Sequence, residues 1–197
     1  MSVIFGIREA GRIVIAGDKR GSKKDGRTYS DNMSKVVAVN EHLAFASAGN
    51  AVFEKLISMK AAEVSGKASL TTDDLAEIVQ AAYREIRDMR VLDKLKMPST
   101  FYFLIAGKSR SGGSSLISGG NFKGSLDAQE VEMILYPPEG ADMKQCCELL
   151  AKNYKLHHTD FAERTVREIS RINPIVSPTG DRWNYDVAMG KGILHSF

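Results

Sequence analysis

A carboxylate and two cations follow one apolar run near the start of the sequence. The run Ile13-Val14-Ile15-Ala16 predicts a short, fully buried strand, and Asp18-Lys19-Arg20 comes soon after it. A buried strand that ends in charged side chains can hold them in a fixed geometry for chemistry. The structural alternative is a simple ion pair at a strand end, which is the commoner use of such residues.

A second apolar run, Val3-Ile4-Phe5-Gly6-Ile7, precedes this strand, and a short polar segment, Arg8 to Gly11, separates the two. This spacing predicts a β-hairpin. We therefore expect the first strand to place the residues before it, including Ser2, next to Asp18.

Residues 2–49 resemble the opening of the proteasome β-subunit and HslV peptidase family of N-terminal-nucleophile hydrolases. In that family a terminal Thr begins a hairpin whose second strand ends in Asp, a Lys follows on the next strand, and a Gly opens the oxyanion hole. The positions that match, in the same order and at nearly the same spacing, are Ser2, Asp18, Lys35 and Gly49. Arg20 also fits the Asp-x-Arg of proteasome β subunits.

The resemblance implies acyl transfer through Ser2. A Ser hydroxyl needs a base beside it, and a free α-amine, with a pKa of about 7.7–8.0, can serve once Met1 is removed. We expect that removal because the second residue is small. A nearby Lys35 would favour the neutral amine, Asp18 would keep Lys35 charged and oriented, and the Gly49 N–H could face the oxyanion.

Two supporting parts of the family pattern differ in this sequence. Tyr136-Pro137-Pro138-Glu139-Gly140 stands where the family has a Gly-Ser-Gly turn. Asn173 and Ser177 are the nearest match to an Asp-x-x-Ser that supports the family's site, and Asn173 can hydrogen-bond but cannot carry a negative charge. Ser in place of Thr also lacks the methyl group that restricts χ1.

Three functions are compatible with these residues. The first is a proteasome-like hydrolase of peptide or other amide bonds, and the second is a non-catalytic subunit that keeps the fold as a scaffold. The third is an amidase or acyltransferase that acts on a small substrate. The resemblance further implies homo-oligomeric rings and an ATP-dependent unfoldase as a partner, and it implies no cofactor.

Composition limits the other classes of function. A formal charge of +3 over 197 residues gives no reason to expect nucleic acid or an acidic membrane as a partner. No apolar run approaches the roughly 18–20 residues of a membrane span, and no signal peptide is visible, so we expect a cytoplasmic protein. Cys146 and Cys147 are adjacent, which argues against a disulfide between them, and no metal-ligand spacing is present.

The remaining patterns predict one domain, residues 1–197, of strands and paired helices. Strands are expected at 35–39 and 43–48, followed by a helix that begins directly after Gly49 and ends at Gly66, and by another from Thr71 to about Asp93. Further expected elements are strands at 101–107, 114–122 and 128–135, helices from Asp142 to Lys155 and from Thr159 or Asp160 to Pro174, and a last strand at 183–189. This order suggests two antiparallel sheets between two pairs of helices, and the family resemblance implies the same α+β, four-layer αββα sandwich.

Overall fold

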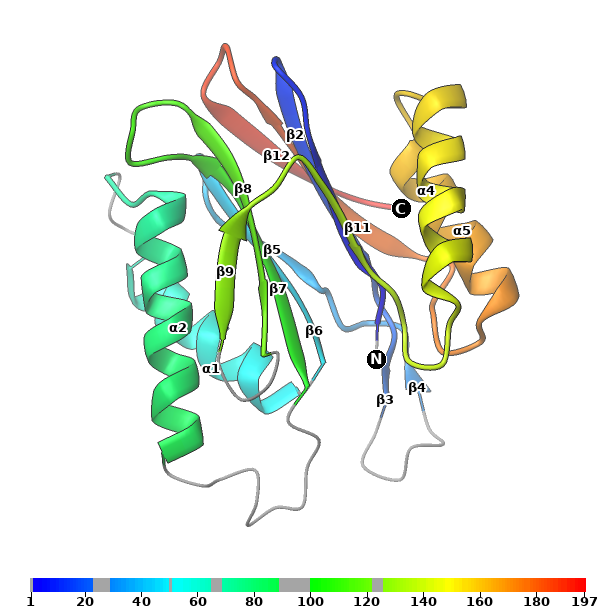
Figure 1. Cartoon of the computed structure of the whole chain (residues 1–197), viewed down its shortest axis with the longest axis horizontal. Coiled ribbons are helices and arrows are strands. Elements are labelled where there is room, and N and C mark those ends of the chain that lie inside the picture. The colour runs from blue at the N-terminus through cyan, green and yellow to red at the C-terminus, as the bar shows by residue number, and fades with distance from the viewer. Residues whose placement is uncertain (1, 23–28, 50, 65–68, 89–99, 122–125) are drawn as a thin grey trace.

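The structure is a computed structural model, and it describes residues 2–22, 29–49, 51–64, 69–88, 100–121 and 126–197. The described part contains two five-stranded antiparallel sheets, a two-stranded ribbon and four helices (Figure 1). This confirms the predicted α+β class. Among the described helices, none has the length and apolar character needed to cross a membrane.

The first sheet carries the predicted N-terminal hairpin. Its strands, in spatial order, are β10 (Met133–Tyr136), β1 (Ile4–Arg8), β2 (Arg12–Asp18), β11 (Gly180–Asp186) and β12 (Lys191–Ser196). β1 and β2 pair antiparallel with Ile4 opposite Gly17. The residues just before β1 therefore lie beside the end of β2, as the hairpin predicted.

The second sheet is formed by strands that are neighbours both in space and along the chain. Its strands, in spatial order, are β5 (Val36–Asn40), β6 (Leu43–Gly49), β7 (Phe101–Lys108), β8 (Ser114–Gly120) and β9 (Asp127–Glu130). The ribbon is formed by β3 (Gly21–Ser22) and β4 (Tyr29–Ser30). The helices are α1 (Ala51–Val64), α2 (Thr72–Asp88), α4 (Met143–Leu156) and α5 (Phe161–Ile172).

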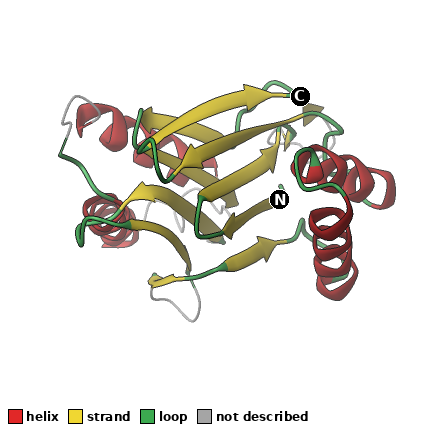
Figure 2. Ribbon diagram, turned by 90° about the horizontal axis from the view of Figure 1, so that it is seen from above, coloured by secondary structure: helices red, strands yellow, loops and turns green. Residues whose placement is uncertain are grey.

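Buried side chains form three clusters that relate the sheets to the helices. One joins the second sheet to α1 and α2, with Phe45, Phe53 and Val79 among its members. Another joins the first sheet to α4 and α5, and a third contains residues of both sheets, including Ile15 and Trp183. Each helix pair thus packs on its own sheet, and Figure 2 shows helices on both sides of the strands.

Two of the expected strands were wrong in extent. The single strand expected at 128–135 is two strands, β9 and β10, which belong to different sheets. Around the break, Val131 N–H bonds the Leu116 carbonyl and the Glu132 carbonyl accepts from Arg8 N–H, so the chain crosses from one sheet to the other there. The last strand is also a hairpin, because Gly190, at φ +65°, turns the chain into β12. β12 is largely exposed and therefore carries no apolar pattern.

The predicted helix starts are largely confirmed. Thr71 and Asp74 bond each other's backbone N–H at the start of α2, and Asp142 accepts N–H bonds at the start of α4. Asp160 is the N-cap of α5, but its side chain accepts from Arg164 Nε and not from a backbone N–H of the first turn. The expected ends of the first two helices, at Gly66 and about Asp93, and of the strand at 114–122 lie outside the described residues. Both cysteines are free, one buried and the other exposed.

Candidate active site

Asp18 is the centre of the candidate site. Its side chain is fully buried at the end of β2, and its two carboxylate oxygens accept three backbone N–H bonds. Val3 N–H donates to Oδ1 at 3.0 Å, Arg20 N–H to Oδ2 at 2.9 Å and Ser177 N–H to Oδ2 at 3.1 Å. One carboxylate therefore joins the start of β1, the end of β2 and the loop that follows α5.

Lys35 supplies the positive charge that faces Asp18. Lys35 is 5% exposed and directly precedes β5 of the second sheet. A β-carbon added to Gly17 would lie 3.1 Å from the Lys35 Cβ, so this lysine packs against the end of β2. Burial raises the pKa of Asp18 above its ordinary value, while the three N–H groups and the Lys35 charge act in the opposite direction. Asp18 and Lys35 are thus brought together, as predicted.

Ser2 lies in the same buried place. Its side chain is 5% exposed, and its hydroxyl donates to the Arg20 carbonyl oxygen at 3.0 Å. Asp18 N–H donates to the Val3 carbonyl at 3.2 Å, which fixes the backbone after Ser2 against the end of β2. The predicted nucleophile is therefore next to the predicted carboxylate, although its hydroxyl is bonded to a backbone acceptor.

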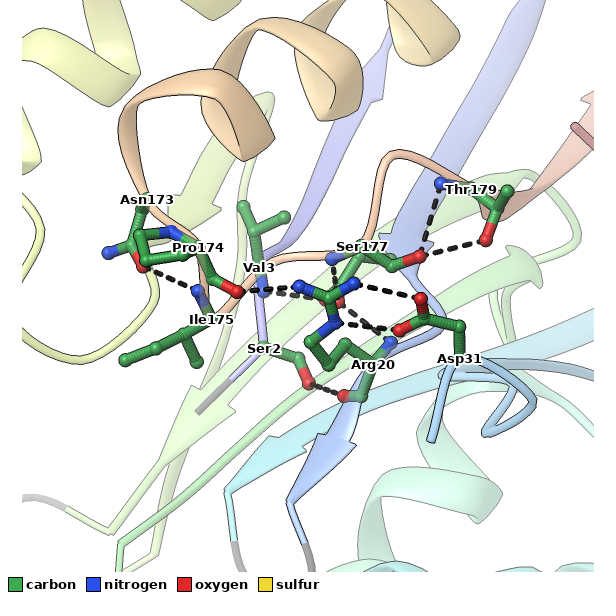
Figure 3. A network of polar contacts seen from close by, with 10 residues as sticks. Ser2, Val3, Arg20, Asp31, Asn173, Pro174, Ile175, Ser177 and Thr179 are labelled. Carbon is green, nitrogen blue, oxygen red and sulfur yellow. Dashed lines mark hydrogen bonds and ion pairs between the residues drawn. The ribbon is translucent and has the colours of Figure 1, made fainter. Parts of the chain in front are cut away.

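The side chain of Arg20 joins two loops through hydrogen bonds. It donates to the two Asp31 oxygens at 2.6 and 2.8 Å, and through Nη1 to the Pro174 carbonyl at 2.6 Å (Figure 3). The hydrogen bonds from Arg20 hold the pKa of Asp31 below its ordinary value. Arg20 thus supports the site by position, and Asp31, its partner, was not predicted from the sequence.

Of the two predicted supporting residues near the end of α5, only Ser177 reaches Asp18. It does so through its backbone N–H, while its hydroxyl pairs with the Thr179 hydroxyl at 2.8 Å. The Asn173 side chain accepts from Ile175 N–H at 3.0 Å and donates to the Glu139 carbonyl at 3.5 Å. Asn173 therefore orders its own loop and the facing turn, while the bonds to Asp18 come from Val3, Arg20 and Ser177.

Gly49 has a structural reason to be glycine. It ends β6 at φ +124°, and a β-carbon there would lie 2.3 Å from the Thr100 carbonyl oxygen. No other residue fits this position without strain. The close approach of β6 to the chain before β7 explains Gly49 without any role in catalysis, so its expected part in an oxyanion hole stays a prediction.

The turn after β10 lies beside Ser2 along the first sheet. Ile4 is opposite Tyr136, so Pro137 and Pro138 follow next to the residues before β1. The Tyr136 hydroxyl bonds the Ser118 hydroxyl at 2.7 Å, and its ring stacks on Tyr102 at a centroid distance of 4.5 Å. A tyrosine that stacks on Tyr102, followed by two prolines, thus stands where the resembled family has a hydroxyl-bearing turn.

The described residues contain no group of three or more His, Cys, Asp or Glu side chains placed to hold a metal ion.

No model of a protein family matches the chain, and no curated protein matches it significantly in sequence. The candidate site is therefore interpreted from its geometry and from the motif in residues 2–49.

Proposed function

We propose that this chain is a proteasome-like N-terminal-nucleophile hydrolase that cleaves peptide or other amide bonds through Ser2. The observation that carries the proposal is the meeting of Ser2, Asp18 and Lys35, from three separate segments, at one buried place. The packing of each helix pair on its own sheet supports a four-layer αββα sandwich, which is the fold that the resemblance implies.

The reaction requires cleavage of the peptide bond before Ser2, which frees its α-amine. Ser2 Oγ then attacks the substrate carbonyl carbon while its proton passes to the α-amine. The substrate C–N bond breaks, the ammonium returns that proton to the leaving amine, and an ester on Ser2 remains. Water attacks the ester, gives one proton back through the α-amine to Oγ, and releases the acid product. No co-reactant other than water is needed.

Lys35 and Asp18 act on this reaction through charge. The Lys35 ammonium favours the neutral form of the α-amine and stabilises negative charge as it develops on Ser2 Oγ. Asp18 in turn holds Lys35 in place, and it is itself fixed by its N–H donors. The proposal includes Gly49 N–H as a donor to the oxyanion, a homo-oligomeric ring, and an ATP-dependent unfoldase that delivers the substrate.

A non-catalytic scaffold subunit is the second candidate, and two specific contacts favour it. The Ser2 hydroxyl donates to the Arg20 carbonyl rather than to a base, and crowding against Thr100 alone explains Gly49. In a scaffold, Asp18 would serve only to join three segments of chain.

Hydrolysis of a panel of fluorogenic peptide amides by the purified protein tests the choice. For the enzyme, Ser2→Ala lowers kcat/KM by about 10³-fold or more, because it removes the nucleophile. Ser111→Ala is the matched control, since Ser111 is exposed in the turn between β7 and β8. Equal rates for the wild type and Ser2→Ala would contradict the proposal and favour the scaffold.

A further inference from the structure

A second carboxylate, Asp181, organises a separate polar cluster beside the candidate site. Asp181 lies on β11, opposite Gly17 of β2 and Ser196 of β12, and is 2% exposed. Lys19 Nζ pairs with its Oδ1 at 2.9 Å, the Ser196 hydroxyl donates to Oδ1 at 2.6 Å, and the Ser34 hydroxyl donates to Oδ2 at 2.6 Å. Both carboxylate oxygens are therefore used.

Two of these partners are the direct chain neighbours of proposed catalytic residues. Lys19 follows Asp18, and Ser34 precedes Lys35. The two segments belong to different sheets, because β2 ends at Asp18 and β5 begins at Val36. Asp181 thus bonds on one side to the end of β2 and on the other to the segment that carries Lys35.

We propose that Asp181 is a positioning residue of this site, which holds Asp18 and Lys35 at their working separation and neutralises the Lys19 charge next to them. The inference rests on the proposed function for its catalytic meaning. A buried carboxylate that lost these partners would be costly, so the cluster forms as a unit. A single unpaired charge in it would act on Lys35 and on the Ser2 amine at short range.

Charged groups that face this cluster come from several segments of the described chain. They are Lys19 at the end of β2, the Asp18–Lys35 pair, and the Arg20–Asp31 pair. Because Arg20 and Asp31 neutralise each other, the charge balance near Lys35 depends mainly on Lys19 and Asp181. Removing the charge of Lys19 or of Asp181 alone changes the net charge near Lys35 by one elementary charge, and removing both restores it.

The test compares Asp181→Asn, Lys19→Met and the double variant in the whole chain. In Asp181→Asn, the uncompensated Lys19 charge lowers the pKa of the Ser2 amine. The acid limb of the pH profile of kcat therefore moves to lower pH by about 0.3–1 unit. The 13C chemical shift of the labelled Lys35 side chain should also change, and this measurement needs no activity. The double variant should return both values to those of the wild type. Asp186→Asn, at the other end of β11, is the matched control.

The outcomes separate this inference from the proposed function. A wild type without Ser2-dependent activity, but with the Lys35 shift and its reversal, would remove the function and keep Asp181 as the residue that sets the Asp18–Lys35 pair. A folded, active Asp181→Asn protein in which neither the acid limb nor the Lys35 chemical shift moves would overturn the inference. If Asp181→Asn does not fold, Lys19→Met alone must move the acid limb to higher pH and change the Lys35 chemical shift, and its failure to do so would also overturn the inference.

Discussion

Asp18 is a buried carboxylate whose partners are almost all backbone groups. Three N–H donors converge on it, and Lys35 adds a positive charge nearby. Burial is the largest influence on the carboxyl and raises its pKa. Burying the Asp18 carboxylate therefore costs the folded protein free energy. The same carboxylate holds three segments of the chain together through its N–H bonds.

Asp18→Asn is expected to lower the free energy of unfolding by about 1–3 kcal/mol, because its amide NH₂ must face at least one N–H donor and leave it unpaired. The loss should grow as the pH is lowered. A carboxyl whose folded pKa is raised contributes stability that is fully present below the unfolded value of 3.8 and is lost as the pH rises through the folded pKa. Denaturant unfolding of the wild type and Asp18→Asn at a series of pH values between about 3.5 and 7 measures the difference.

The difference in the free energy of unfolding between the wild type and Asp18→Asn isolates the contribution of Asp18. The pKa of Asp31 is lowered by Arg20, and that of Asp74 is lowered to about 2 by Thr71 and Arg110, so their contributions fall as the pH falls. Those changes occur in both proteins and cancel. Asp142→Asn is the control, because Asn also caps a helix well. A difference that shrinks toward acid pH would contradict the account of Asp18.

Sequence pattern identified some residues of the site and missed others for a physical reason. Ser2, Asp18 and Lys35 were found because motif spacing fixes their order along the chain. Asn173 was expected to support the site but bonds within its own loop and to the facing turn. Asp181 and Asp31 were missed because their roles come from contacts between distant segments, for which a single sequence gives no signal.

At the scale of elements, the meeting of β6 and the start of β7 depends on one backbone conformation. Gly49 has φ +124°, and its α-carbon has no room for a β-carbon beside Thr100. The pairing of Gly49 with Phe101 places this contact where α1 and β7 both adjoin β6. The glycine thus sets how closely the two strands approach at the end of the second sheet nearest Lys35.

Gly49→Ala should destabilise the fold by about 1–3 kcal/mol from the backbone conformation alone, with a further cost from the close contact with Thr100. Thermal or denaturant unfolding measures this loss. Gly11→Ala is the matched control, since a β-carbon at Gly11 meets nothing within 4 Å. A Gly49→Ala protein as stable as the wild type would show that the β6–β7 contact relaxes easily.

Element boundaries were predictable wherever burial gives a pattern. β1, β2, β6 and β7 are almost entirely buried and were recognised as apolar runs. β12 was missed because its residues are mostly exposed, and the β9–β10 break was missed because Val131 and Glu132, which separate the two strands, include no Gly, Pro or other turn residue. The crossing between sheets is a tertiary event that the local sequence does not encode.

At the scale of the whole molecule, the three buried clusters share strands and leave no sheet independent. The first sheet contributes to the cluster with α4 and α5 and to the cluster between the sheets, and the second sheet contributes to the latter and to the cluster with α1 and α2. Trp183, the only tryptophan, is fully buried in the cluster shared by both sheets. It therefore reports on the contact between them.

We expect a single cooperative unfolding transition for the monomeric unit. Trp183 fluorescence, which follows the contact between the sheets, should change at the same denaturant concentration as far-UV circular dichroism, which follows the helices. The native emission should also be shielded from acrylamide, because the indole is buried. Two separated transitions would contradict this and would indicate that one sheet with its helices unfolds alone.

The proposed reaction requires Ser2 to be a free and activated terminal nucleophile. Intact mass of the purified protein, taken before and after incubation with a peptide epoxyketone or a β-lactone, tests it most directly, with peptide mapping to locate any adduct. The account predicts that Met1 is absent and that one adduct forms at Ser2 and is lost in Lys35→Met. Retention of Met1, or an exposed Ser2 without an adduct, would contradict the account and make Ser2, Asp18 and Lys35 parts of a scaffold.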